Sequence, residues 1–128
     1  MITEDYVSFE NSKILKEKGF GEECLGTYNT GDKELNISSE CSYSNDLNDD
    51  MFIAAPTLQM AMKWLREVHN IFIQVDYIWS TKELYTYTFD IHNMKSARSI
   101  FSTPYGELFN SYEEACEAAI KYCLTNLI

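Results

Sequence analysis

The sequence contains no hydrophobic run that could cross a membrane and no targeting segment. No stretch approaches the ~18 consecutive apolar residues of a membrane-spanning helix. The first residues, MITEDYVSFENSK, include acidic side chains and lack the apolar core of a signal peptide. These absences argue against a membrane role. They predict a cytoplasmic protein whose four cysteines stay reduced.

Basic side chains are also scarce. Ten Lys and Arg residues stand against 20 Asp and Glu residues, so the formal net charge is −10 at pH 7. Residues 19–50 hold eight of the acidic side chains and one basic side chain, Lys33. Such a segment repels a phosphate backbone, so we expect no direct binding of nucleic acid. Solvated acidic loops are the simplest interpretation, and mimicry of a nucleic acid by this segment is an alternative.

The motifs that usually hold metals, cofactors or nucleophiles are missing. Sixteen residues separate Cys24 from Cys41 and six separate Cys116 from Cys123, and neither spacing matches the short cysteine pairs of zinc sites. The sequence has no GxGxxG, P-loop, HExxH or GxSxG motif. We therefore expect no metal and no cofactor, and we interpret Cys116 and Cys123 as buried apolar residues of a helix.

Histidine is rare, which limits the catalytic alternatives. The sequence has two histidines, His69 and His92. His69 lies on an apolar helix face, where a structural role is the simpler interpretation. His92 follows Asp90 at the end of a predicted strand, and Cys41 lies in a polar segment. A small hydrolase or transferase that depends on Cys41 or on His92, with Asp90 beside it, is therefore an alternative, although no pattern links these residues.

Hydrophobic periodicity and capping residues predict three helices. Ser8 is placed to cap a helix that runs to about Lys18 and closes at Gly19. A second helix follows Thr57, which is placed to cap it. The third begins with Ser111 and Glu114 at the spacing of a capping box.

Alternating patterns predict the strands. One hairpin covers residues 25–38, and a longer one covers residues 71–92 with its turn at residues 80–83. Another short strand is expected at residues 99–102. The order α-β-β-α-β-β-(β)-α predicts a single α+β domain over residues 1–128. In this domain an antiparallel sheet of about four to five strands has the helices packed on one face.

The helix at residues 57–70 is apolar around an unusually large part of its circumference. The face expected to be buried holds Leu58, Ala61, Met62, Leu65, Val68 and His69. Met60 and Trp64 widen this apolar arc to about twice the stripe that a core-facing helix needs. Both residue types are common at interfaces. We therefore predict that Met60 and Trp64 form an exposed flank that contacts a partner. This favours a non-enzymatic interaction protein that acts through a protein partner or as a homo-oligomer.

Three stretches carry a resemblance to a known group of proteins. They are DYVSFENSKILKEKGF, APTLQMAMKWLREVHNIFIQV and SYEEACEAAIKYCLTNLI. They resemble small phage- and prophage-related proteins of Bacteroides-group gut bacteria, and the similarity is weakest between about residues 26 and 50. The resemblance implies an origin in a mobile element and a location in the bacterial cytoplasm. This group has no established activity, so the resemblance implies no functional residues.

Overall fold

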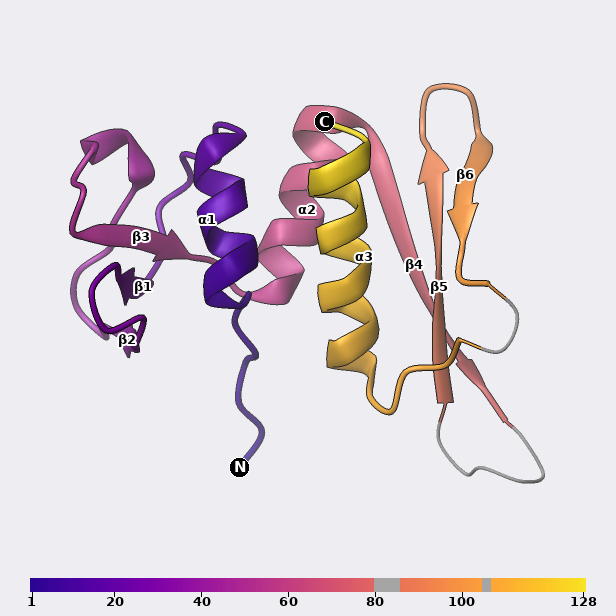
Figure 1. Cartoon of the computed structure of the whole chain (residues 1–128), viewed down its shortest axis with the longest axis horizontal. Coiled ribbons are helices and arrows are strands. Elements are labelled where there is room, and N and C mark those ends of the chain that lie inside the picture. Colours follow the sequence, from indigo (N-terminus) through magenta and orange to yellow (C-terminus); the bar gives the residue numbers. More distant parts are fainter. Residues whose placement is uncertain (80–85, 105–106) are drawn as a thin grey trace. The chain divides into compact units, whose positions relative to one another are not determined.

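The computed structural model describes residues 1–79, 86–104 and 107–128 (Figure 1). Within these residues, helices and two antiparallel sheets confirm the predicted α+β class. The elements are α1 (Phe9–Glu17), β1 (Gly26–Asn29), β2 (Leu35–Ile37), the short 3-10 helix η1 (Asn45–Leu47), β3 (Phe52–Ala55), α2 (Leu58–His69), β4 (Ile71–Ile78), β5 (Thr86–Asn93), β6 (Arg98–Ser102) and α3 (Tyr112–Asn126).

The chain forms two compact units, residues 1–61 and residues 62–128, which we call the N-terminal and C-terminal units. Helix α2 begins in the N-terminal unit and continues into the C-terminal unit. The prediction that the whole chain is one domain stays a prediction. Among the described residues, no helix has the length and apolar character needed to span a bilayer.

The N-terminal unit contains a three-stranded sheet in the order β2-β1-β3, with both pairings antiparallel. Its core lies on the face that packs against α1. Tyr28, Ile53 and Ala55 are buried there, and the rings of Tyr6 and Phe9 pack against them. The Tyr28 hydroxyl donates a hydrogen bond to the Val7 carbonyl at 2.7 Å, which ties β1 to the residues before α1.

Strand β3 corrects the predicted sheet. The sequence predicted no strand between residues 39 and 57 and one sheet of about four to five strands. The structure has two separate sheets of three strands each. Phe52–Ala55 completes the first sheet because it pairs with β1, more than 20 residues earlier in the chain. A strand of four residues leaves little periodic signal, and its partner is distant in sequence.

The C-terminal unit contains the sheet β4-β5-β6, and α3 lies along one face of it (Figure 1). The register places Ile73 opposite Ile91 and Val75 opposite Phe89. These side chains face α3, whose buried residues include Cys116 and Cys123, as predicted. The predicted turn at residues 80–83 lies outside the described residues.

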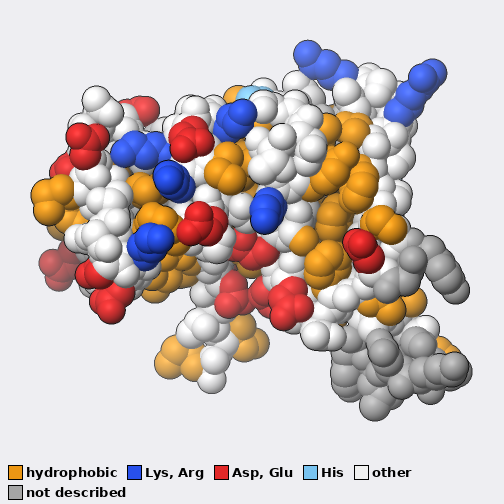
Figure 2. Space-filling view, in the orientation of Figure 1, with side chains coloured by type: hydrophobic (Ala, Val, Ile, Leu, Met, Phe, Trp, Pro, Cys, Tyr) orange, Lys and Arg blue, Asp and Glu red, His pale blue; other side chains and the backbone are white. Residues whose placement is uncertain are grey.

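Aromatic rings follow the side of the C-terminal sheet that carries α3. Phe89 lies 5.8 Å from both Phe101 and Phe109, measured between ring centroids, and Phe101 stacks on Tyr122 at 4.1 Å. Figure 2 shows hydrophobic side chains gathered between α3 and this sheet. Large rings of this kind supply much of the apolar area that a small sheet can bury.

The predicted caps are present at all three helices. The Ser8 hydroxyl accepts a hydrogen bond from the Asn11 N–H at 3.3 Å, and the Ser111 hydroxyl accepts one from the Glu114 N–H at 3.1 Å. At α2, the Thr57 hydroxyl accepts from the Met60 N–H at 3.2 Å. These side chains satisfy backbone donors that the first helical turn leaves without partners.

The flank of α2 differs from the prediction. Trp64 is 6% exposed, and its ring meets the His69 ring edge-on at 4.7 Å. Trp64 lies one turn beyond the fully buried Ala61, so its indole continues the buried face of the helix. Met60 is 39% exposed, and Val68, which was predicted to be buried, is 53% exposed in the last turn. The surface predicted from Met60 and Trp64 is therefore reduced to Met60.

Candidate functional site

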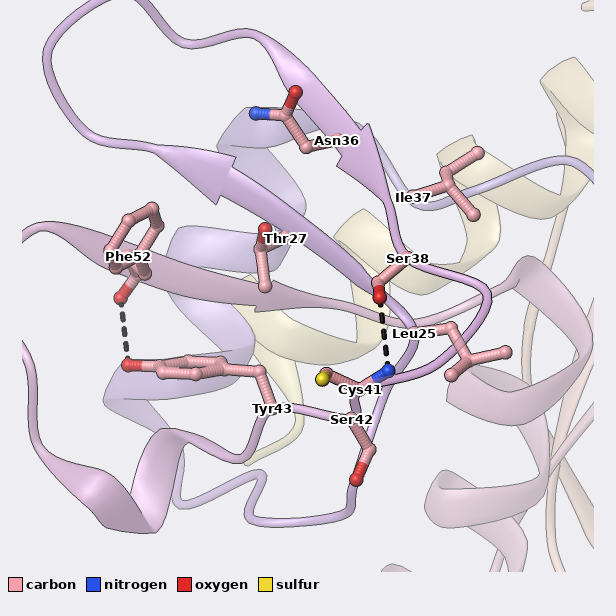
Figure 3. A pocket seen from close by; sticks show the side chains of 9 residues that line it. All are labelled: Leu25, Thr27, Asn36, Ile37, Ser38, Cys41, Ser42, Tyr43 and Phe52. Carbon is pink, nitrogen blue, oxygen red and sulfur yellow. Dashed lines mark hydrogen bonds between the residues drawn. The ribbon is translucent and has the colours of Figure 1, made fainter.

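A cavity of about 330 Å³ opens on the N-terminal sheet, on the face opposite to α1 (Figure 3). Thr27 of β1, Asn36 of β2 and Phe52 of β3 form its floor. Thr27 and Asn36 lie directly opposite each other in the register, so their side chains leave the sheet on the same face. The remaining lining residues are Leu25, Ile37, Ser38, Cys41, Ser42 and Tyr43.

The wall of the cavity is the loop that follows β2. The Ser38 hydroxyl accepts hydrogen bonds from the N–H groups of Glu40 and Cys41, at 3.3 and 3.0 Å, and so closes a turn. Tyr43 is then tied to Cys24 by two backbone hydrogen bonds of 2.8 Å. These contacts hold the Cys41 side chain at the cavity, so the wall is a defined structure (Figure 3).

The lining of the cavity carries no formal charge. Its polar groups are hydroxyls, one carboxamide and the thiol of Cys41, and the rest of the surface is apolar. Besides Cys41, Tyr43 is the titratable residue of the lining. Burial is the largest influence on its phenol and raises the pKa. A hydrogen bond with the Asp49 backbone lowers this pKa, and the negative charge of Asp49 raises it. The phenol is therefore neutral at pH 7, and the cavity suits an uncharged group.

One edge of this sheet is closed by side chains. On β3, the Tyr43 hydroxyl donates to the Phe52 carbonyl at 3.2 Å. The Ala54 N–H donates to the carboxamide oxygen of Asn45 at 2.9 Å, and the nitrogen of the same carboxamide donates to the Phe20 carbonyl at 2.9 Å. Asn45 is itself buried. The η1 region therefore takes the place of a further strand at β3.

The opposite edge, β2, is open. The Ser38 N–H donates to the Leu25 carbonyl, and the Asn29 N–H donates to the Glu34 carbonyl. These two bonds fix which β2 residues form hydrogen bonds with β1. By the alternation of an antiparallel ladder, the N–H and C=O groups of Leu35 and Ile37 then point outward. Within the described residues, these four groups have no hydrogen-bond partner. All three residues of β2 are exposed, and Ile37 is 59% exposed.

The structure places the predicted polar residues in different units. Cys41 lines the cavity of the N-terminal unit, whereas Asp90 and His92 belong to β5 of the C-terminal unit. Both histidines of the sequence follow residue 61, so the N-terminal unit contains none. Cys41 therefore has no histidine within its own unit that could act as its base.

His92 and Asp90 lie two residues apart on β5. His92 lies opposite Phe72 in the register, and its Nε2 atom is buried without a hydrogen-bond partner among the described residues. Asp90 is half-buried on the same face of β5. Within the described part of the chain, no three His, Cys, Asp or Glu residues are close enough together to hold a metal ion.

The other three cysteines are unsuited to act as nucleophiles. Burial raises the pKa of Cys24 and of Cys116 to about 11 and that of Cys123 to about 12. A thiol with such a pKa is protonated at neutral pH, and the thiolate is the reactive form. Cys41 is the exposed cysteine of the four.

Sequence reasoning did not find this cavity, apart from Cys41. Its lining comes from residues 25, 27, 36–38, 41–43 and 52, which are brought together by the unexpected strand β3. A usable signal was the pair Tyr43 and Phe52, two aromatic residues at either end of a polar and acidic stretch. In the structure their rings meet edge to face at 6.1 Å.

Comparisons with protein families, with curated proteins and with solved structures give no match for this chain.

Proposed function

We propose that this chain is a non-enzymatic interaction protein that binds a segment of a partner protein at its N-terminal unit. In this proposal, the partner adds an extended strand to β2 and places one side chain in the cavity beside it. The open edge of β2 is the observation that carries the proposal. Strand addition of this kind obtains affinity from backbone hydrogen bonds and specificity from pockets for alternate side chains.

The cavity and the edge are continuous, which supports their use by one ligand. Asn36, Ile37 and Ser38 line the cavity, and Ile37 also presents outward backbone groups. A strand laid against β2 would project every second side chain toward the face of the sheet that holds the cavity. At about 330 Å³, the cavity is at the small end of ligand pockets, which suits a single side chain.

The contrast between the two edges strengthens this interpretation. Exposed edge strands invite unwanted pairing, and proteins usually cover or blunt them. Here β3 is covered by Tyr43 and Asn45, whereas β2 keeps Leu35 and Ile37 exposed. An edge that is left open beside a cavity, in a sheet whose other edge is closed, favours a binding role.

The resemblance to phage- and prophage-related proteins supports a bacterial protein as the partner. The catalytic alternative is weaker, because Cys41 lacks a histidine in its unit and the other cysteines are protonated. Homo-oligomerisation through β2 is also weaker, because it would bring two acidic segments together.

Selection from a displayed library of random peptides tests the proposal, with pairs of matched variants. Ile37→Pro removes an outward N–H that β1 does not use, whereas Ile37→Val keeps it. Thr27→Tyr fills the cavity floor, and Thr27→Val preserves its shape. We expect enriched peptides that lose binding to Ile37→Pro and Thr27→Tyr and keep binding to both valine variants. If no enriched peptide shows this pattern while all four variants remain folded, the proposed function is wrong.

A further inference from the structure

The surroundings of the cavity are strongly acidic although its lining is neutral. Glu34 directly precedes β2, Glu40 directly precedes Cys41, and both are exposed. Asp49 is close enough to Tyr43 to raise the pKa of the phenol through its charge. Two carboxylates therefore stand next in sequence to β2 and to Cys41, and the charge of a third acts on Tyr43, whereas the cavity lining itself is uncharged.

Lys33, the basic residue of the acidic segment 19–50, does not offset these negative charges at the cavity. The Nζ atom of Lys33 lies 5.3 Å from the centroid of the Phe9 ring. Phe9 belongs to α1 and packs against the core, on the face of the sheet opposite to the cavity. A cation over an aromatic face is held there by the ring quadrupole. Lys33 therefore lies away from the cavity, and the cation beside Asp49 is Lys16, whose Nζ atom donates to the Asp49 carbonyl at 3.4 Å.

We infer that the segment bound at this site is cationic. It is an extended stretch of a partner protein with one uncharged apolar side chain in the cavity and Lys or Arg residues on either side of it. This inference rests on the proposed function and specifies the partner. The acidic side chains around the cavity speed the encounter with a cationic segment. They also reject acidic competitors, because like charges repel across an interface.

The same charges decide between possible occupants. A second copy of this chain, paired through β2, would place Glu34 and Glu40 of each copy near their counterparts. Like charges on adjacent strands destabilise the pairing. A phosphate group or an acidic peptide would meet the same repulsion. A basic, extended segment is the occupant that fits both the neutral cavity and its acidic rim.

Three synthetic peptides of about seven residues test the inference by fluorescence anisotropy. The first has a central leucine flanked by lysine and threonine. The second replaces the lysines by glutamate, and the third replaces the leucine by serine. We expect the first peptide to bind at least about tenfold more tightly than either of the others, and its affinity to fall as salt rises from about 0.05 to about 0.5 M.

Variants of the protein separate the charge effect from the site. The double variant Glu34→Gln and Glu40→Gln should weaken the first peptide by about three- to tenfold and reduce its salt dependence. Thr27→Tyr should abolish the preference for leucine over serine, and Thr27→Val should keep it. The leucine peptide should also slow the reaction of Cys41 with a thiol reagent, because Cys41 lines the cavity.

The possible failures can be told apart. If the leucine and serine peptides bind equally, or Thr27→Tyr changes nothing, the acidic surface attracts cations without a site and the inference is wrong. If the library selection yields edge- and cavity-dependent peptides that are neutral or acidic, the inference is wrong and the proposed function stands. If neither the library nor the leucine peptide gives binding that depends on the edge and the cavity, both are wrong.

Discussion

The two sheets of this chain have the same number of strands but differ in how they are stabilised and in what they expose. The C-terminal sheet has strands of eight, eight and five residues, and rings on its α3 side contact one another. The N-terminal sheet has strands of four, three and four residues and a smaller core. It compensates with hydrogen bonds from side chains, such as those of Tyr28 and Asn45.

Charge follows the same division. Residues 1–61 hold twelve acidic and four basic side chains, a net charge of −8, whereas residues 62–128 hold eight acidic and six basic side chains, a net charge of −2. Self-repulsion destabilises compact states, so a small sheet with this charge is not optimised for stability alone. In the function proposed above, the N-terminal unit carries recognition and the C-terminal unit is mainly a packed scaffold.

The largest expected effect concerns the aromatic core of the C-terminal unit. Phe89 is 4% exposed and contacts the rings of Phe101 and Phe109. Phe89→Ala should lower the free energy of unfolding by about 3–5 kcal/mol, because it leaves a cavity among these rings. Phe72→Ala, on the other face of the same sheet, is the matched control and should cost about 1 kcal/mol. Equal losses in chemical denaturation would contradict the scaffold role of the aromatic side.

A smaller effect is expected where α3 meets this sheet. Ala119 is fully buried, and the neighbouring Ala118 is only half-buried. Ala119→Leu should overpack the contact and lower the free energy of unfolding by about 1–3 kcal/mol. Ala118→Leu should cost less than half as much. Denaturant titration of the two variants would show an error in the assignment of the helix face if Ala118→Leu were the more destabilising.

The third prediction tests the closed edge of the N-terminal sheet. Asn45→Ala removes hydrogen bonds to the Ala54 N–H and to the Phe20 carbonyl, both in buried surroundings. The loss should be about 1–2 kcal/mol, because two backbone groups are left without a partner. Asn36→Ala, on the open edge, should stay within about 0.5 kcal/mol. Thermal melts that rank the two variants in reverse would remove the distinction between the edges.

The parts of this fold that follow from local chemistry could be predicted from the sequence. Ser8, Thr57 and Ser111 cap helices through contacts within three residues, so their sequence patterns were sufficient. Long-range pairing could not be predicted in the same way. Strand β3 is defined by its pairing with β1, and the cavity exists only once that pairing is made.

Helix α2 shows a different limit of sequence reasoning. Its apolar arc was correctly identified, but the arc does not state how far the protein interior extends along the helix. Trp64 is covered whereas Val68, one turn later, is half exposed, although both belong to the same arc. Periodicity gives the direction of the core around a helix, and the burial of each turn depends on tertiary contacts that the pattern does not contain.

The smallest expected effect compares the two cysteines of the N-terminal unit. Cys41 is exposed at the cavity, whereas Cys24 is 5% exposed and burial raises its pKa to about 11. The thiolate is the reactive form, so at pH 8 a buried thiol with a raised pKa reacts slowly. A thiol reagent should therefore label Cys41 first in the native protein and reach all four cysteines only after unfolding. Cys41→Ser should abolish the fast labelling and change the free energy of unfolding by less than about 0.5 kcal/mol, since an exposed side chain contributes little to stability.

A second cysteine that reacts as fast as Cys41 would show that the N-terminal unit opens readily. In that case its small sheet would be a flexible element, and the cavity would exist in only some of its conformations instead of being a preformed site.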